Sequence, residues 1–332
     1  MTTAADYPPL QIGPRTVPMP TSVSDAARQY LAMPRTVSLD SNYPALDDKE
    51  GWRAHIAAVN AMIDQMEQMI VRACAIEVER TTINGVRAAI VRPKNPDPRF
   101  EGRVLMNIHG GAYIYCEGGI MEAAVIANAG ATVVAVDYRV CPDHPFPANI
   151  EDSAAVYRGL LDSHAPEQIA IYGTSAGGTF TLTSSLYIRQ LGLPLPGALG
   201  VLTPQHDLSG TAGDTSYAFD GLDVALSGTR PADGLGPAFV FANGHAIADP
   251  LISPIFGDYA GFPPTYFLSG TRDMLLSSTV LLHRRLHNAG VKTELHVFEA
   301  MPHGFSVLVQ LPEAQESIQD LLRFFDQNLA KG

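Results

Sequence analysis

Short apolar runs alternate with helix-length segments along most of this chain. From about residue 86 onward, runs rich in β-branched residues are separated by stretches long enough for one helix each. This alternation predicts a mostly parallel β-sheet with helices on both faces. The leading strand candidates are Val86–Val91, Val104–Ile108, Thr132–Val136, Ile169–Tyr172, Ala198–Leu202, Thr265–Ser269 and Glu294–Phe298.

The first 75 residues or so do not follow this alternation. Residues 1–20 contain five prolines, which predicts an extended arm. Asp48 to Arg72 is expected to form one long helix, because large apolar residues recur there at helical spacing. These residues are Trp52, Ile56, Val59, Ile63, Met66 and Ile70. We therefore expect residues 1–75 to be organised separately from an α/β domain over 76–332.

Composition limits the size and the partners of this protein. With 332 residues, 46% of them hydrophobic, the chain can bury the core of one large domain and a smaller addition. The formal net charge is −12, and no basic run could follow a phosphate backbone, so we expect no nucleic-acid partner. Three scattered cysteines predict no disulfide framework and favour a reducing compartment.

Signals for export, membranes and cofactors are missing from the sequence. The N-terminus lacks the basic and apolar regions of a signal peptide, so we expect a cytoplasmic protein. No apolar run of about 20 residues predicts a membrane span, and we expect no stable membrane insertion. Neither metal-ligand spacing nor a phosphate-binding or dinucleotide-binding motif is present. We expect no cofactor and no metal.

A Gly-x-Ser-x-Gly motif at residues 173–177 is the strongest chemical signal. It follows the apolar run Gln168 to Tyr172 and precedes a helix-compatible run, Thr179 to Gln190. A strand, a sharp turn and a helix form a nucleophile elbow, whose strained turn holds the Ser175 hydroxyl at the carboxyl end of the sheet. Since glycine and serine are common, the motif alone also fits an ordinary strand-to-helix turn.

A second signal is the glycine pair after the strand candidate Val104–Ile108. His109-Gly110-Gly111-Ala112-Tyr113 can turn backbone N–H groups toward a cavity, where they would bind the oxyanion of a tetrahedral intermediate. The N–H of Ala176, the residue after the serine, is the usual partner. We expect His109 itself to brace this loop; the alternative is a plain strand-to-loop turn.

An aspartate and a histidine follow in the chain order typical of this chemistry. Asp273 ends an apolar segment, and we expect it to orient a histidine. The alternative role, which the same residue could also serve, is the cap of a helix expected to run to Ala289. His303 lies between Pro302 and Gly304 after the last strand candidate, 30 residues beyond Asp273, and could act as general base. His296 is the rival, but its place inside the strand pattern would point its ring into a sheet face.

These and further motifs appear in one order along the chain. They begin at His109 (His-Gly-Gly-Ala-Tyr), Asp137 (Asp-Tyr-Arg), Cys141 (Cys-Pro-Asp-His-Pro-Phe-Pro-Ala), Glu151 (Glu-Asp), Gly173 (Gly-Thr-Ser-Ala-Gly-Gly) and Met301 (Met-Pro-His-Gly-Phe). From about residue 80 to the C-terminus, the chain closely resembles bacterial hormone-sensitive-lipase-like esterases, the α/β-hydrolase group with a Gly-Thr-Ser-Ala-Gly elbow.

The resemblance implies a fold, a cap and a set of site residues. The fold would be an α/β-hydrolase fold, with a mostly parallel sheet of the eight-stranded type flanked by helices. Residues 1–75 would form an N-terminal arm and helical cap over the active-site mouth, with 209–248 contributing to the cap. The implied catalytic triad is Ser175, Asp273 and His303. The implied oxyanion hole uses the N–H groups of Gly111, Ala112 and Ala176, with Gly110 supporting the loop.

Other marked residues have candidate roles near this site. By the same resemblance, Asp137, Arg139 and Asp152 brace the loop that carries Pro142 to Pro147. Tyr113 and Asp207 are candidates for the substrate pocket. Asp207 follows the strand candidate that ends at Leu202, and the alternative role, a turn aspartate, is equally compatible with the sequence. In the family, a third glycine usually stands where this chain has Ala112. The Cβ of alanine narrows the backbone angles available at this position.

The expected reaction is hydrolysis of a small-molecule ester or lactone. A small capped pocket implies short- to medium-chain acyl esters. A lactone hydrolase would use the same residues, and an amide or formamide hydrolase would demand better protonation of the leaving amine. A non-catalytic ligand receptor is a further alternative. Some relatives with this fold are receptors that have lost the triad histidine, and the presence of His303 here argues against that role. Through its final edge strand, Leu295 to Phe298, the chain could form a homodimer; a monomer is the alternative.

Overall fold

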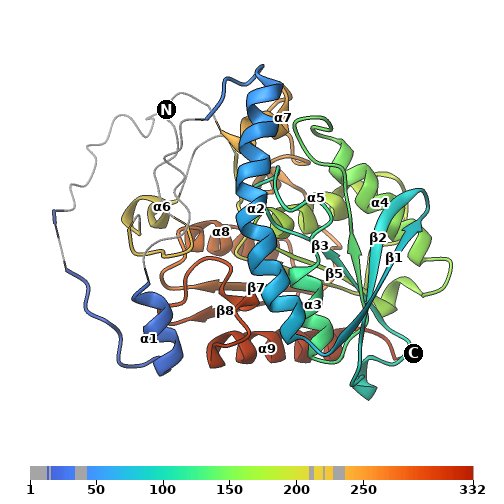
Figure 1. Ribbon diagram of the computed structural model, residues 1–332. Helices are drawn as coiled ribbons and strands as arrows, with labels where there is room; N and C mark the ends of the chain where they lie inside the picture. The colour runs from blue at the N-terminus through green and yellow to red at the C-terminus, as the bar shows by residue number, and fades with distance from the viewer. Residues whose placement is uncertain are drawn as a thin grey trace.

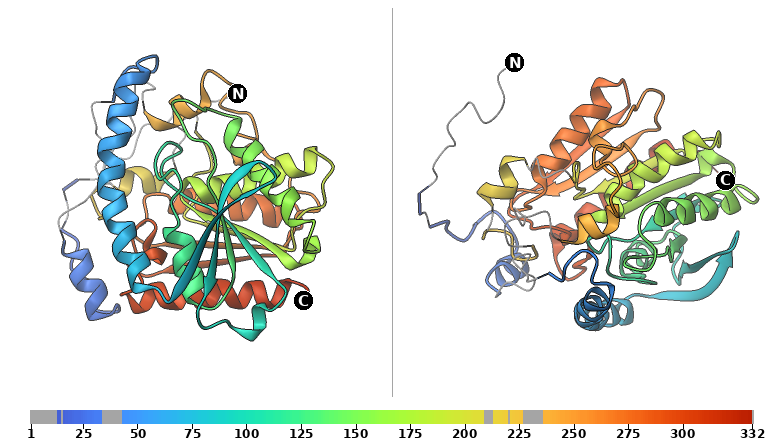
Figure 2. Two further views of the ribbon diagram at one scale, coloured as in Figure 1. Left: turned by 45° about the vertical axis from the view of Figure 1, so that its right-hand side comes forward. Right: turned by 90° about the horizontal axis from the view of Figure 1, so that it is seen from above.

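The protein is built around one eight-stranded sheet with helices on both faces, as the computed structural model shows (Figures 1 and 2). The structure describes residues 13–14, 16–33, 43–208, 213–219, 221–226 and 236–331. The strand order is β1-β2-β4-β3-β5-β6-β7-β8. Strands β1 and β2 pair antiparallel, as do β2 and β4, while every later pair is parallel. The predicted fold class is confirmed.

The strands and helices of the described residues have the following bounds. The strands are β1 (Ile76–Ile83), β2 (Val86–Pro93), β3 (Val104–Ile108), β4 (Val133–Val136), β5 (Ile169–Thr174), β6 (Ala198–Leu202), β7 (Thr265–Gly270) and β8 (Thr293–Phe298). The helices are α1 (Asp25–Leu31), α2 (Lys49–Ala73), α3 (Met121–Asn128), α4 (Ala148–Leu160), α5 (Ala176–Gln190), α6 (Asp214–Ala218), α7 (Pro237–Ala242), α8 (Leu276–Asn288) and α9 (Pro312–Asn328).

Two apolar cores, one on each face, hold the sheet between its helices. Every residue of β3, β4, β5, β6 and β7 is buried, which explains why these strands read as continuous apolar runs. One core joins the sheet to residues of α4, α5 and α8, and the other joins it to residues of α3 and α9. Burial of both faces fixes the register of the central strands.

The first strand, β1, is an addition to the predicted set of strands. It forms a hairpin with β2 through Asn84 and Gly85, both with positive φ (47° and 86°). Asn-Gly is the sequence expected for a tight hairpin turn of this kind. Strand β1 was missed because its side chains are mostly half-buried or exposed and carry charge, which hides the apolar pattern.

The parallel strands bring the candidate site residues to one edge of the sheet. Ser175 follows β5, and the loop after β3 carries His109 to Tyr113. Asp273 lies three residues after the end of β7, and His303 lies in the loop after β8. Because parallel strands end at the same edge, these four loops converge there.

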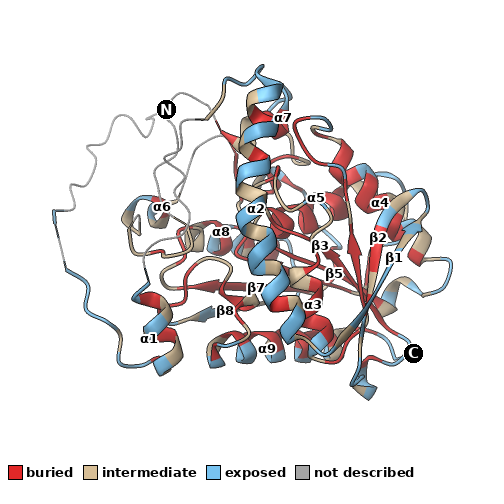
Figure 3. Cartoon of the chain, viewed as in Figure 1, coloured by how far each residue is buried: buried red, intermediate tan, exposed pale blue. Residues whose placement is uncertain are grey.

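Helix α2 crosses the front of the molecule in Figure 1, and the other cap candidate, 209–248, is partly described. Trp52, Ile56 and Ile70 are buried on the inner face of α2, whereas Met62 and Met69 are more than half exposed. Figure 3 shows this contrast as an exposed outer surface along the helix. Residues 1–12, 15 and 34–42 of the expected arm and cap lie outside the described residues.

Candidate active site

The turn around Ser175 has the geometry of a nucleophile elbow. Ser175 lies between β5 and α5 with φ 60° and ψ −123°, a strained conformation for a residue with a side chain. A Cβ on Gly173 or Gly177 would lie 2.2 or 2.1 Å from the carbonyl oxygen of Ile108. Only glycine therefore lets β3, β5 and α5 approach this closely, and the close approach presents the Ser175 hydroxyl at the sheet edge.

The structure brings Ser175, His303 and Asp273 into one hydrogen-bonded chain. Ser175 Oγ lies 2.9 Å from His303 Nε2, and His303 Nδ1 lies 3.0 Å from Asp273 Oδ1. These contacts fit a ring whose Nδ1–H donates to the carboxylate and whose Nε2 accepts from the hydroxyl. Such an arrangement can remove a proton from the serine oxygen and hold the resulting imidazolium.

Asp273 is held in a fixed orientation by its own neighbours. Its side chain is fully buried, Oδ2 accepts from Ser269 Oγ at 2.7 Å, and Oδ1 accepts from the N–H of Leu275 at 2.9 Å. The residue that caps α8 is Leu275, so Asp273 stands two residues before the cap position proposed as its alternative role. Its carboxylate thus serves the turn and the histidine together.

The environment of His303 favours a charged ring. Burial lowers the pKa of His303, but the charge and hydrogen bond of Asp273, together with the charges of Asp223 and Glu122, outweigh this lowering. The net result is a pKa raised above the ordinary histidine value. A base with a raised pKa holds the transferred proton better during the reaction.

The loop after β3 presents free N–H groups beside Ser175. Gly111 and Ala112 have φ of 122° and 48°, and a Cβ on Gly111 would lie 2.5 Å from the carbonyl oxygen of Tyr115. Within the described residues, the N–H groups of Gly111, Ala112 and Ala176 donate to no backbone carbonyl. The N–H of Gly110 instead donates to Glu122 Oε1 at 2.8 Å. The N–H of Gly110 is therefore engaged by a carboxylate within the protein, which supports the loop.

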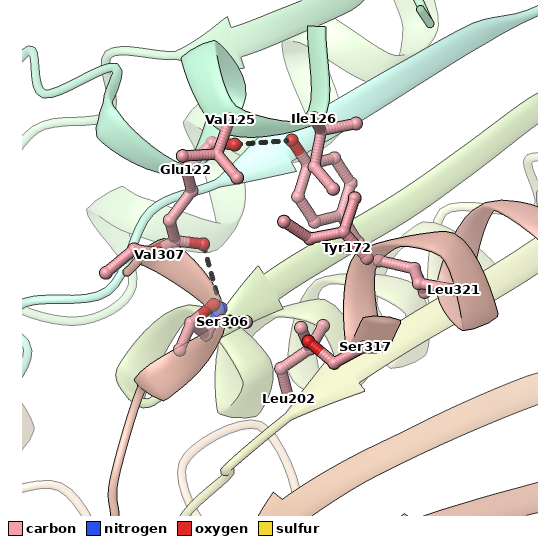
Figure 4. A pocket seen from close by; sticks show the side chains of 11 residues that line it. Glu122, Val125, Ile126, Tyr172, Leu202, Ser306, Val307, Ser317 and Leu321 are labelled. Carbon is pink, nitrogen blue, oxygen red and sulfur yellow. Dashed lines mark hydrogen bonds between the residues drawn. The ribbon is translucent and has the colours of Figure 1, made fainter. Parts of the chain in front are cut away.

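Glu122 is a site residue that the sequence did not single out. Its carboxylate accepts from the N–H of Gly110, from the N–H of Thr174 at 3.0 Å and from Asn107 Nδ2 at 3.2 Å. Figure 4 shows its side chain at the wall of a small cavity, near Ser306 and Tyr172. Burial raises the pKa of Glu122 to about 7. One side chain thus ties residues 109–113, the oxyanion loop of the sequence prediction, to Thr174, the residue before Ser175.

His109 braces the same loop. Its ring is buried and stacks on Tyr138 with 4.2 Å between ring centroids, while Nδ1 lies 2.7 Å from the carbonyl oxygen of Gly110. Burial lowers the pKa of His109 to about 4, so the ring is neutral at physiological pH. His296, the rival to His303, instead bonds Asp320 at 3.1 Å and lies against Tyr266.

The two pocket candidates, Tyr113 and Asp207, are both buried. The ring of Tyr113 packs against Phe180 and Phe241, and its hydroxyl donates to Gln205 Oε1 at 3.2 Å. Asp207 Oδ1 accepts from Ser253 Oγ at 3.4 Å, a contact typical of a residue that holds a loop. The loop brace expected for Asp152 is present, because it accepts from the N–H of Arg139 at 2.8 Å and pairs with the same guanidinium.

Helix α2 is hydrogen-bonded to the segment that follows the oxyanion loop. His55 Nε2 lies 2.9 Å from the hydroxyl of Tyr115, and Asn60 Oδ1 accepts from the N–H of Cys116 at 3.0 Å. Further along the helix, Glu67 Oε2 accepts from the N–H groups of Ile120 and Met121 at 2.9 and 3.1 Å. Three places along α2 thus hold residues 115–121.

Two further properties concern metals and membranes. Among the residues that the structure describes, no group of three or more His, Cys, Asp or Glu side chains could hold a metal ion. In the same part of the chain, no helix is both long and apolar enough to cross a bilayer.

Comparison with known proteins matches this geometry to a family. A family model described as alpha/beta hydrolase fold matches residues 105–307. The chain belongs to this family. Within the matched range lie the elbow, Asp273 and His303, together with the oxyanion loop.

Solved structures and curated relatives place this alpha/beta hydrolase among esterases. The crystal structure of an esterase E25 is 36% identical with a TM-score of 0.89, covering 97% of this chain and 99% of that chain. An esterase from the bacterial hormone-sensitive lipase family is 28% identical with a TM-score of 0.73, covering 92% and 96%. The putative acetyl-hydrolase LipR of Mycobacterium tuberculosis (strain ATCC 25618 / H37Rv) is 32% identical over 73% of this chain and 78% of its own length. The predicted family resemblance is confirmed.

Proposed function

We propose that this carboxylesterase-type hydrolase cleaves short- to medium-chain acyl esters through a covalent acyl-enzyme on Ser175. The observation that carries the proposal is the chain of hydrogen bonds from Ser175 through His303 to Asp273, at 2.9 and 3.0 Å. An elbow serine, a histidine with a raised pKa and a buried carboxylate are the groups that acyl transfer needs.

The first half of the reaction forms the acyl-enzyme. His303 Nε2 takes the proton of the Ser175 hydroxyl as the oxygen attacks the ester carbonyl. The N–H groups of Gly111, Ala112 and Ala176 donate to the oxyanion that forms. His303 then gives the proton to the leaving alcohol as the carbon–oxygen bond of the ester breaks.

The second half releases the acid. A water molecule loses a proton to His303 Nε2 and attacks the acyl carbonyl, and the same three N–H groups hold the second oxyanion. As the bond to Ser175 breaks, His303 returns the proton to the serine oxygen. Asp273 stays ionised in both halves and stabilises the imidazolium.

The substrate range follows from the cap and from the names of relatives. LipR is named a putative acetyl-hydrolase, which supports a short acyl chain for this protein. In this proposal, α2 and the described part of 209–248 form the cap of a catalytic domain over 76–332. The position of helix α7 supports this assignment of the cap, because Phe241 of α7 packs against Tyr113, the last residue of the oxyanion loop.

The direct test is hydrolysis of p-nitrophenyl esters from acetyl to dodecanoyl by the native chain and three variants. We expect turnover that is highest for short esters, and a loss of about 10⁴-fold or more in Ser175→Ala and His303→Ala. His296→Ala is the matched control, because that ring also pairs with an aspartate but away from the elbow; it should retain activity.

Two outcomes would contradict the proposal. Undiminished activity in Ser175→Ala would show that the elbow serine is not the nucleophile. A native chain that hydrolyses lactones or amides but no linear ester would keep the mechanism and replace the substrate class.

A further inference from the structure

Asp223 is a buried carboxylate next to His303 that no step of the proposed reaction uses. Its side chain has no exposed surface, although it belongs to the short described segment 221–226. Oδ1 accepts from the N–H groups of Ala225 and Leu226 at 3.0 and 3.1 Å, which anchors the carboxylate in its own turn.

The same carboxylate reaches two catalytic loops. Oδ2 accepts from the N–H of Met274, the residue after Asp273, at 3.1 Å. The N–H of His303 points at both oxygens, 3.2 Å from Oδ2 and 3.3 Å from Oδ1. Asp223 therefore joins the backbone of the acid loop to the backbone of the histidine loop, across 51 and 80 residues of sequence.

Asp223 also adds negative charge beside the imidazole. The charged groups that face His303 are Asp273, Asp223 and Glu122, and each raises the pKa of the ring. Burial raises the pKa of Tyr30 of α1 to about 12, and the charge of Asp223 adds to this rise. Burial raises the pKa of Asp223 itself to about 6, so it is ionised at the alkaline pH of an esterase assay.

We propose that Asp223 is a positioning residue of the hydrolysis reaction, which fixes the backbone of His303 and Asp273 and stabilises the imidazolium through its charge. This proposal rests on the proposed function. It means that the segment 209–248 contributes a side chain to the catalytic arrangement as well as a cover for the pocket. Because its hydrogen bonds go to the backbone of its own turn, of Met274 and of His303, Asp223 acts through the histidine loop and the Asp273 loop.

Removing the charge should change both the rate and its pH dependence. Asp223→Asn loses the ionised acceptor of four N–H groups, so we expect kcat for p-nitrophenyl butyrate to fall about 10- to 100-fold with KM nearly unchanged. Loss of a negative charge beside the ring lowers the pKa of His303. The acid limb of the kcat/KM profile should therefore move to lower pH, by about half a unit or more.

Two companion variants separate charge from folding. Asp223→Glu keeps the charge but displaces the oxygens, so kcat should fall while the acid limb stays near its native pH. Asp152→Asn is the matched control, because Asp152 is also a buried carboxylate bound to a backbone N–H and to a loop. It should lower the melting temperature without moving the acid limb.

The outcomes separate this inference from the proposed function. If the native chain hydrolyses the ester and Ser175→Ala does not, the proposed function stands whatever Asp223→Asn does. An Asp223→Asn profile that coincides with the native one in kcat and acid limb would overturn the positioning role. An equal shift in Asp152→Asn would do the same. If Asp223→Asn does not fold, Asp223→Glu provides the test. An acid limb that moves by about half a pH unit in that variant would refute the charge effect.

Discussion

Buried carboxylates organise the backbone of this active site at the scale of single residues. Glu122 holds Gly110 and Thr174, and Asp223 holds Met274 and His303, in each case through backbone N–H groups. Hydrogen bonds between a charged acceptor and an N–H are stronger than those between neutral groups. The loop after β3 and the loops that carry Met274 and His303 can therefore keep fixed positions without regular secondary structure.

The first prediction concerns Glu122. In Glu122→Gln the N–H groups of Gly110 and Thr174 lose an ionised acceptor, so the oxyanion loop and the elbow are less firmly joined. We expect kcat to fall about 10- to 100-fold, with a smaller change in KM, in steady-state assays with p-nitrophenyl butyrate. Glu117→Gln is the control, because Glu117 is an exposed carboxylate of the same loop that pairs with Arg87; it should have native kinetics.

The same substitution should change how stability depends on pH. The pKa of Glu122 is about 7 in the folded protein, against an ordinary value of 4.5, so between these limits the folded state binds more protons than the unfolded state. The contribution of Glu122 to the free energy of unfolding is therefore fully present below pH 4.5. It is lost as the pH rises toward 7, by up to about 3 kcal/mol. Urea unfolding at several pH values should show this loss in the native chain and not in Glu122→Gln; parallel curves would contradict it.

Motifs predict some of these residues and not others. Ser175, Asp273 and His303 could be proposed because each follows a strand candidate, and a serine in a Gly-x-Ser-x-Gly turn has a known geometry. Glu122 and Asp223 have no such signal. Their partners lie 52 residues away for Thr174 and 80 residues away for His303, and a backbone N–H carries no residue type that a sequence pattern could detect.

Helix α2 links the cap to the catalytic loops at the scale of elements. Its buried residues alone would make it a cover for the domain, yet Asn60 and Glu67 also bind backbone N–H groups between Cys116 and Met121. The helical spacing of apolar residues predicted α2 to within a residue at each end. This spacing did not predict that polar residues of the same helix would hold residues 116–121, the segment after the oxyanion loop.

The second prediction tests this link. Asn60→Ala removes the acceptor for the N–H of Cys116, and Glu67→Gln replaces an ionised acceptor with a neutral one, so we expect kcat to fall by about 3- to 30-fold while the fold persists. Met69→Gln on the exposed face of the same helix should leave kcat unchanged. Circular dichroism and steady-state kinetics on the same samples measure both effects. If all three variants have native kcat, the helix only covers the domain.

The two edges of the sheet matter most at the scale of the whole molecule. Strands β1 and β8 are the outermost strands of the described sheet, and each has a valine that is 40% exposed, Val78 and Val297. Dimerisation through the last strand remains a prediction, and an unpaired edge strand is the feature that allows it. The central strands were predictable because burial on both faces leaves continuous apolar runs, whereas the cap candidate 209–248 contains little strand pattern.

The third prediction concerns this edge. If two copies pair through β8, a charge at Val297 should oppose the pairing, and Val297→Lys should turn a dimer into a monomer in analytical ultracentrifugation. Val78→Lys places the same charge on the opposite edge and should leave the dimer intact. A native chain that sediments as a monomer would contradict the dimer, and equal behaviour of both variants would place its interface elsewhere.

A cytoplasmic location also stays a prediction.

The most direct test of the proposed mechanism is to find which residue acts as the nucleophile. Phenylmethylsulfonyl fluoride reacts with a serine that a neighbouring base has activated, and peptide mapping by mass spectrometry then locates the adduct. We expect one sulfonyl group per chain, on the peptide that contains Ser175, with activity lost in proportion, and a much slower reaction in His303→Ala. An adduct on another residue, or full activity in a chain sulfonylated at Ser175, would contradict this mechanism.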